Sequence, residues 1–203
     1  MQRCKEETRT EILRHAARIF RTRGFAGSSM REIADAAHVC LSNIYNYFPG
    51  KDAIFRAVVR PATLALEKML QGHHGQQGED VMSIGTEAYL QKVTGEYVAL
   101  LDRHRTTLEL LFFRAQGSSL ENYRETYTDR STALVRAWLD DMKRRHPRMN
   151  TEVSDFSIHL HTVWMFTLFE EIIMHRIKPK DTPQIVAEYI RFETTGWREL
   201  MKL

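Results

Sequence analysis

The sequence predicts an all-α protein, and three observations lead to that fold class. Only five prolines and ten glycines interrupt its 203 residues. Between these breaks, apolar residues recur at intervals of three and four, as on one helix face, and strand-like alternation is nearly absent. A hydrophobic share of 43% is too high for a disordered chain and sufficient for a sizeable core. The length allows one or two domains.

The first two helices are predicted by a stripe and a cap. Apolar residues from Ile12 to Phe20 form one helix face, which should end at Gly24 because glycine commonly terminates helices. Ser29 and Glu32 then fit a capping box, in which each side chain bonds the other residue's backbone N–H. A short helix should follow.

The next helix should be equally short. After the connecting residues 38–40, we expect it over 41–47, with residues 48–50 closing it. Lys51 should begin a longer helix. Pro61 lacks a backbone N–H, so it should kink that helix or restart it.

The rest of the chain should form five more helices after a flexible linker at 71–78. Glycine, serine and proline breaks at 117–119, 146–147 and 178–179 help to bound them. We expect these helices at about 79–102, 105–116, 119–145, 154–176 and 182–202.

Residues 29–48 fit a helix-turn-helix, because two short helices are joined by three residues. The outward residues of the second helix are polar or aromatic and include no acid, which suits a helix that reads base edges between phosphates. Serine and asparagine would face base edges, while arginine, tyrosine and lysine would hold phosphates. An ordinary helical hairpin with a hydrated polar face is the alternative. The candidate DNA-contacting residues are Arg31, Ser42, Asn43, Tyr45, Asn46, Tyr47 and Lys51.

Charge is distributed unevenly along the chain. Residues 1–60 carry 11 Lys and Arg against 6 Asp and Glu, whereas residues 61–203 carry 18 against 20. A basic amino-terminal region favours a polyanionic partner, although many hydrated surfaces differ by a few charges. Two cysteines cannot form a disulfide framework, and the charged start does not fit a secretion signal, so we expect a cytoplasmic protein without a membrane span.

Several motifs in this region resemble the TetR family of bacterial transcriptional regulators. They are Gly24-Phe25, Ser28–Ala34, Ala37-x-Val39 and, most specifically, Ile44-Tyr45-Asn46-Tyr47-Phe48-Pro49-Gly50-Lys51-Asp52. The resemblance covers about a quarter of the chain. It implies a homodimer with a three-helix DNA-binding head, residues 1–56, and a larger helical domain, residues 57–203, that binds an inducer and dimerises. By position, it assigns the same candidate residues to DNA.

Two residues depart from the family's usual pattern. His38 stands where a glycine is usual in the turn, so modest backbone strain is expected. Cys40 stands where a serine usually begins the recognition helix, and cysteine is a poorer cap. A thiol at a helix amino end also suits a redox sensor. A small residue tolerated at a cap is the simpler interpretation.

The last two helices are more apolar than one subunit's core requires. Residues 156–174 are apolar on nearly every side, and the last helix is broadly apolar as well. We therefore predict that these helices pair with the same helices of a second copy. A single larger monomeric core is the alternative.

The middle helices should enclose the inducer pocket, although aromatic residues at helical spacing more often belong to the core. His159 and His161 are two residues apart and would point about 200° apart, so they cannot chelate one ion together. His73 and His74 should be solvated in the linker. We expect no metal and no cofactor. The candidate pocket residues are Phe112, Phe113, Tyr127, Trp138, His159, Val163 and Trp164.

The sequence has no Gly-rich phosphate loop, HExxH or GxSxG motif, so an enzyme is not expected. It predicts a homodimeric transcriptional repressor that a small, largely apolar molecule releases from its operator. The alternative is a helical ligand-binding or interaction protein whose head no longer reads DNA.

Overall fold

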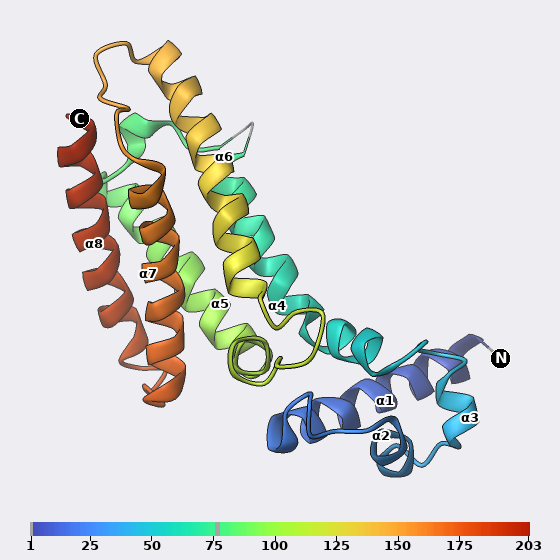
Figure 1. Ribbon diagram of the computed structural model, residues 1–203. Helices are drawn as coiled ribbons and strands as arrows, with labels where there is room; N and C mark the ends of the chain where they lie inside the picture. Colours follow the sequence, from blue (N-terminus) through green and yellow to red (C-terminus); the bar gives the residue numbers. More distant parts are fainter. Residues whose placement is uncertain (1, 76–77) are drawn as a thin grey trace. The chain divides into compact units, whose positions relative to one another are not determined.

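The computed structural model describes residues 2–75 and 78–203, and within them it contains eight α-helices, one short 3₁₀ helix and no strand (Figure 1). The predicted all-α fold class is confirmed. The helices are α1 Gln2–Arg23, α2 Met30–Ala36, α3 Leu41–Ile44, α4 Lys51–His74, η1 Val81–Ser83, α5 Glu87–Phe113, α6 Tyr123–Arg145, α7 Asp155–Met174 and α8 Thr182–Met201.

The chain divides into two compact units. The first unit comprises the chain through Thr63 together with Thr106–Tyr123. The second unit comprises Leu64–Arg105 together with Arg124–Leu203. The helices α4 and α5 therefore each contribute residues to both units. Among the described residues, no helix combines the length and the apolar character needed to cross a bilayer.

An aromatic cluster forms the core of the first unit. The ring centroids of Phe20 and Phe55 lie 5.1 Å apart, and Phe25 lies 6.1 Å from the first and 5.4 Å from the second. Burying each ring contributes roughly 1.5–3 kcal/mol. Ile12 and Phe20 are fully buried, which confirms the predicted apolar stripe of α1. Ile44 is also fully buried and fixes α3 on this core.

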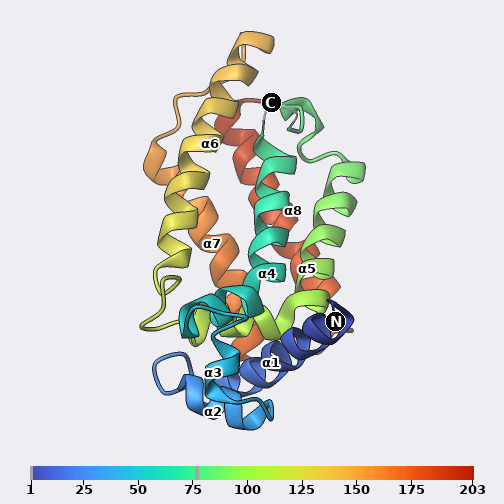
Figure 2. The same cartoon turned by 90° about the vertical axis from the view of Figure 1, so that its right-hand side faces the viewer.

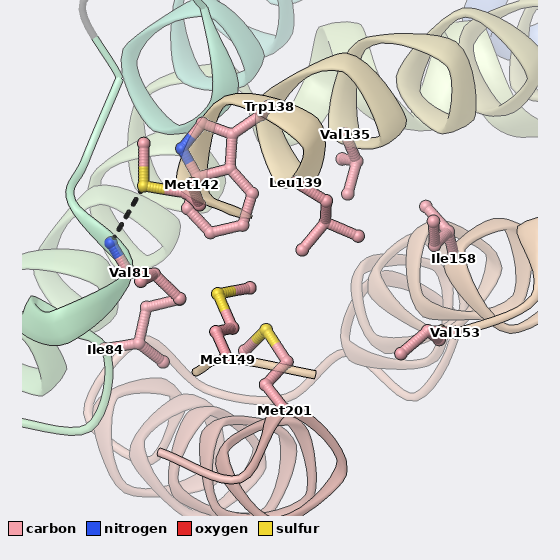
Figure 3. Packing of buried hydrophobic residues seen from close by; sticks show 10 residues of the cluster. All are labelled: Val81, Ile84, Val135, Trp138, Leu139, Met142, Met149, Val153, Ile158 and Met201. Atoms are coloured by element: carbon pink, nitrogen blue, oxygen red, sulfur yellow. Dashed lines mark hydrogen bonds between the residues drawn. The ribbon is translucent and has the colours of Figure 1, made fainter. Parts of the chain in front are cut away.

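The second unit is a bundle formed by the carboxyl-terminal part of α4 with most of α5 and with α6, α7 and α8. Figures 1 and 2 both show α7 and α8 side by side. At one end of the bundle, residues from η1, α6, α7, α8 and the intervening loops form a compact apolar cluster (Figure 3). Its members are Val81, Ile84, Val135, Trp138, Leu139, Met142, Met149, Val153, Ile158 and Met201.

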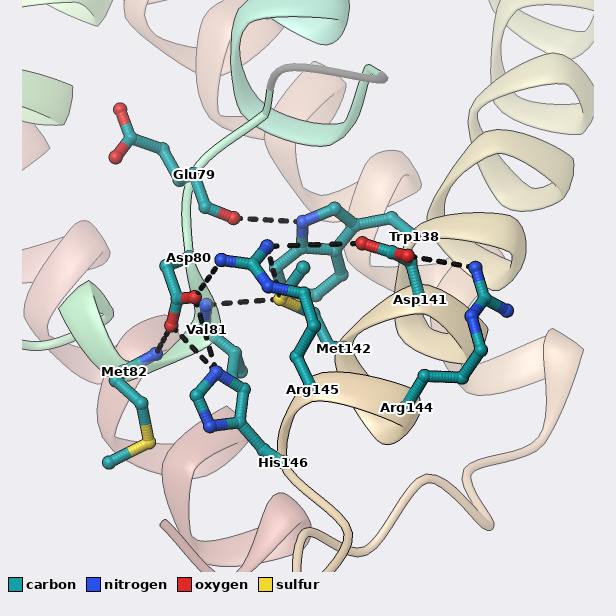
Figure 4. Close-up of polar contacts among 10 residues, drawn as sticks. All are labelled: Glu79, Asp80, Val81, Met82, Trp138, Asp141, Met142, Arg144, Arg145 and His146. Atoms are coloured by element: carbon teal, nitrogen blue, oxygen red, sulfur yellow. Dashed lines mark hydrogen bonds and ion pairs between the residues drawn. The ribbon is translucent and has the colours of Figure 1, made fainter.

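The segment that enters this cluster is fastened to the end of α6 (Figure 4). Asp80 caps η1 by accepting a hydrogen bond from the Met82 N–H at 2.9 Å, and its carboxylate also contacts Arg145 and His146. The Met82 N–H has the largest effect in lowering the pKa of Asp80. The Trp138 indole donates to the Glu79 carbonyl at 2.9 Å.

The helix α4 differs from expectation in two ways. It continues through Pro61 without restarting. It also includes His73 and His74, so the prediction that both histidines are solvated in a linker is wrong. The His74 ring lies 5.1 Å from the Trp138 ring, and the His73 ring lies 6.5 Å from the Tyr89 ring. These contacts compensate for the glycine in this turn, which costs about 1 kcal/mol in a helix.

The helix α5 is one element, so the predicted break between 102 and 105 is wrong. That segment is polar but has no glycine or proline, and polarity alone does not end a helix. The start of this region was also predicted to be helical from residue 79. A short 3₁₀ turn and Gly85, with φ of 83°, precede α5 instead.

Candidate nucleic-acid interface and internal cavity

The capping box predicted for α2 is present. Ser29 Oγ accepts a hydrogen bond from the Glu32 N–H at 3.2 Å, and the Glu32 carboxylate accepts one from the Ser29 N–H at 3.0 Å. The Ser29 hydroxyl has the largest effect in lowering the pKa of Glu32. Glu32 also forms an ion pair with Arg23, which ties α2 to the end of α1. Arg31 is exposed one position earlier.

The turn between α2 and α3 carries both predicted departures from the family pattern. His38 has φ of 55°, a left-handed conformation that glycine adopts more easily. Cys40 precedes α3 at the cap position, and its exposed side chain makes no cap hydrogen bond. The turn therefore forms without the two residues that would favour it most.

The segment from α3 to Tyr47 presents a polar and aromatic surface. Helix α3 is shorter than predicted, because only Leu41–Ile44 are α-helical. A tight turn continues it, in which the Tyr47 N–H donates to the Ile44 carbonyl at 3.0 Å. Tyr47 is half-buried. The exposed side chains of this segment include Ser42, Asn43, Tyr45 and Asn46.

Two of these exposed side chains hold each other in place. The Asn46 amide donates to Asn43 Oδ1 at 3.1 Å, which orients both amides. Tyr45 is 52% exposed, so its hydroxyl is free to reach past the protein surface. This surface has hydrogen-bonding groups suited to base edges and phosphates, and it carries no carboxylate.

Lys51 is partly buried at the start of α4. Its Nζ donates to the carbonyls of Phe25 and Ser28, both at 2.7 Å, and lies 4.2 Å from the centroid of the Phe25 ring. The neighbouring Asp52 accepts hydrogen bonds from the backbone and hydroxyl of Ser119 at 2.7 and 2.8 Å. Lys51 therefore closes the loop between α1 and α2, with one of its three N–H groups left for another acceptor.

The second unit contains a partly enclosed cavity of about 90 Å³, lined by side chains from α4, α5, α6, α7 and α8. A single water needs only about 10–15 Å³, so this cavity has room for a small organic molecule. Its lining is mainly apolar and aromatic, as in typical ligand pockets. The aromatic rings come from Tyr89, Tyr97, Tyr127, Trp138, Tyr189 and Trp197.

A polar group crosses this cavity from α7 to α8. His161 Nδ1 lies 2.6 Å from Glu193 Oε2 and 3.0 Å from the Trp197 indole nitrogen. A ring nitrogen either carries a proton or offers a lone pair, so Nδ1 cannot donate to the carboxylate and accept from the indole together. One of the two contacts is a hydrogen bond at a time.

Three buried polar atoms of the cavity lining have no hydrogen-bond partner among the described residues. They are His74 Nδ1, the Tyr189 hydroxyl and Glu193 Oε1. Burial lowers the pKa of His74 to about 3, with smaller effects from His73 and His161, so this imidazole is neutral at pH 7. Burial, followed by the Glu193 carboxylate, raises the pKa of Tyr189.

Comparison with known proteins places this architecture. Residues 12–58 match the family model for bacterial regulatory proteins of the tetR family. The HTH-type transcriptional regulator UidR of Escherichia coli strain K12 is 29% identical over 160 residues, which cover 70% of this chain and 81% of UidR. The chain belongs to the TetR family.

Solved TetR-family structures share the fold well beyond the amino-terminal segment. NalD, the secondary repressor of the MexAB-OprM multidrug efflux pump in Pseudomonas aeruginosa, superposes with a TM-score of 0.66 over 94% of this chain and 96% of its own, at 19% identity. A TetR-family member from Streptomyces coelicolor A3 gives a TM-score of 0.60 over 88% of each chain at 21% identity. The TetR family consists of DNA-binding transcriptional regulators, so this chain is a regulator and not an enzyme.

The TetR-family cavity includes two of the seven candidate pocket residues, Tyr127 and Trp138. The other five lie elsewhere. Phe112 and Phe113 belong to the first unit, and Phe113 is exposed. His159 faces Asp129 at 3.9 Å, and Trp164 is 48% exposed on α7. The carbonyl of Val163 accepts a hydrogen bond from Arg124.

Sequence reasoning missed the polar residues of the cavity, and one signal could have found them. The buried face of α8 runs through Val186, Ile190, Glu193 and Met201, with Trp197 partly buried on the same face. Glu193 is an acid in the middle of this apolar stripe, which is costly unless the carboxylate is paired or used.

Proposed function

We propose that this TetR-family regulator is a homodimeric repressor that leaves its operator when a small molecule enters the cavity of the second unit. The observation that carries the proposal is the exposed, acid-free surface from α3 to Tyr47, held by the buried Ile44 and the capped α2. The repressor role of NalD supports repression here. Reading chromosomal DNA would place the protein in the bacterial cytoplasm.

Within the proposed DNA-binding head, residues 1–56, Ser42, Asn43 and Asn46 meet base edges. Arg31, Tyr45 and Tyr47 hold phosphates. Lys51 adds its one remaining N–H to a phosphate.

A second copy would cover the exposed apolar side chains of α7 and α8 in the proposed ligand-binding and dimerisation domain, residues 57–203. Phe192 is 73% exposed, and Gly196 and Leu200 follow it at intervals of four on the same face of α8. On α7, Phe156 and Trp164 are 69% and 48% exposed. Exposed apolar groups of this size support a protein interface, and a symmetric dimer would present two heads to two half-sites.

Ligand release would use α4. This helix begins at Lys51 and ends at His74, which lines the cavity. A ligand that binds one position of α4 better than another would shift the separation of the two heads and weaken their joint binding to DNA.

Fluorescence anisotropy with labelled DNA tests the proposal. The probe is the promoter region of the protein's own operon, titrated at several salt concentrations. We expect affinity to fall steeply with salt because phosphate contacts release counterions. Tyr45→Ala should weaken binding to all sequences about equally, whereas Asn43→Ala should relax the choice between sequences. A chain that ignores duplex DNA in dilute buffer would contradict the proposal.

A further inference from the structure

The partnerless polar atoms of the second unit gather in one cavity. Buried polar groups are nearly always hydrogen-bonded, and exceptions call for an explanation. Here the described chain leaves a histidine nitrogen, a tyrosine hydroxyl and a carboxylate oxygen without partners, and all three residues line the same cavity. A bound molecule that pairs with these groups is the simplest explanation.

The cavity lining is acidic rather than basic. Glu193 is 5% exposed and is the only carboxylate among the lining residues, which include no lysine or arginine. His73 faces Glu96 at 2.5 Å, and His74 is neutral at pH 7. An anionic ligand would therefore meet a buried acid and no cationic side chain, which is unfavourable.

Glu193 has one oxygen in use and one available. Oε2 lies 2.6 Å from His161 Nδ1, whereas Oε1 has no partner among the described residues. Since Trp197 competes for the same His161 nitrogen, the group already shares its protons among too few acceptors. A ligand that donates a hydrogen bond to Oε1 would satisfy the carboxylate without disturbing the contact with His161.

We propose that the cavity binds a small organic amine, with its protonated nitrogen on Glu193 Oε1 and its apolar body against the surrounding aromatic rings. A buried carboxylate pairs favourably with an ammonium group that donates directly to it. Aromatic faces near the same point stabilise a cation further. This inference rests on the proposed function, because it names the chemical class of the ligand that enters the cavity.

Binding measured without DNA tests the ligand class. Isothermal titration of the full chain at pH 7 compares matched sets with one body and three head groups: benzylamine, benzyl alcohol and benzoate, then cyclohexylmethylamine, cyclohexylmethanol and cyclohexanecarboxylate. In each set we expect the amine to bind about tenfold more tightly than the alcohol, because a charged hydrogen bond replaces a neutral one, and the carboxylate to bind weakest.

Variants then locate the preference. Glu193→Gln should remove about tenfold of amine affinity and leave the alcohol within about twofold, because the amide keeps the size of the side chain but not its charge. Glu199→Gln, at an exposed position of the same helix, should leave the amine affinity unchanged.

The ranking in the unmodified chain tests the proposal even if Glu193→Gln does not fold. Two results would overturn it: no amine binds more tightly than its matched alcohol, or the preference survives in a folded Glu193→Gln. Because DNA is absent, a failure of operator binding leaves this ranking unaffected. Conversely, an operator-binding chain that prefers carboxylates would retain the proposed function and lose only this inference.

Discussion

The two compact units treat their buried polar groups differently. In the first unit, ammonium and carboxylate groups pair with loop backbone: Lys51 with two carbonyls and Asp52 with the Ser119 N–H. In the second unit, His74, Tyr189 and Glu193 leave polar atoms without partners among the described residues. The first unit is therefore arranged to hold a fixed surface, whereas the second has unused binding capacity around a cavity.

The largest expected effect tests how strongly the first unit depends on its aromatic core. Phe55 is fully buried against Phe20 and Phe25, so Phe55→Ala should lower the free energy of unfolding by about 3–5 kcal/mol. Phe113→Ala is the matched control, because that ring is 37% exposed in the same unit, and it should cost less than about 1 kcal/mol. Urea denaturation followed by circular dichroism measures both.

Tryptophan fluorescence separates the units in the same experiment. Trp138, Trp164 and Trp197 all belong to the second unit. For Phe55→Ala we expect the fluorescence transition to move less than the circular dichroism transition. Equal shifts would contradict the view that each unit has its own core.

Acid should act on the second unit through His74. An unfolded histidine takes up a proton near pH 6.5, whereas the folded pKa is lowered to about 3. Between these values the unfolded state binds more protons, so stability falls as the pH drops from about 6.5 and the loss is complete near pH 3. We expect a loss on the order of 2–4 kcal/mol, from the same linkage.

His74→Gln isolates this effect, because glutamine does not titrate. The variant should lose less stability than the wild type between pH 7 and pH 4, measured by urea denaturation at each pH. His175→Gln is the control, since the His175 side chain is 69% exposed. An identical pH dependence in wild type and His74→Gln would show that this burial does not set the acid sensitivity.

The same contrast between units explains what the sequence could predict. The capping box of α2 joins residues three apart, and the end of α1 depends on a single glycine, so short-range patterns identified both. The cavity joins side chains from five helices, as when the Tyr127 hydroxyl reaches the Leu66 carbonyl 61 residues away. No local period encodes such neighbours. The role of Lys51 in closing a loop 23–26 residues earlier was hidden for the same reason.

Lys51 offers a way to separate structural support from DNA contact within the first unit. Lys51→Met removes the donor to two loop carbonyls, so the free energy of unfolding should fall by about 2 kcal/mol, and DNA affinity should fall with it. Arg31→Ala, at an exposed position of α2, should lower DNA affinity while changing stability by less than about 0.5 kcal/mol. Urea denaturation and DNA anisotropy report the two quantities. An unchanged unfolding midpoint in Lys51→Met would mean that its loop contacts contribute little.

The smallest expected effect concerns the cap of α3. Cys40 makes no side-chain hydrogen bond at that position, and serine would supply an oxygen to accept an N–H of the first turn. Cys40→Ser should therefore raise the free energy of unfolding by about 1 kcal/mol, with Cys40→Ala as the control that changes size without adding an acceptor. Because Ile44 already fixes α3 on the core, DNA affinity should stay within about twofold of wild type. A serine variant no more stable than the alanine variant would show that packing, rather than capping, holds this short helix in place.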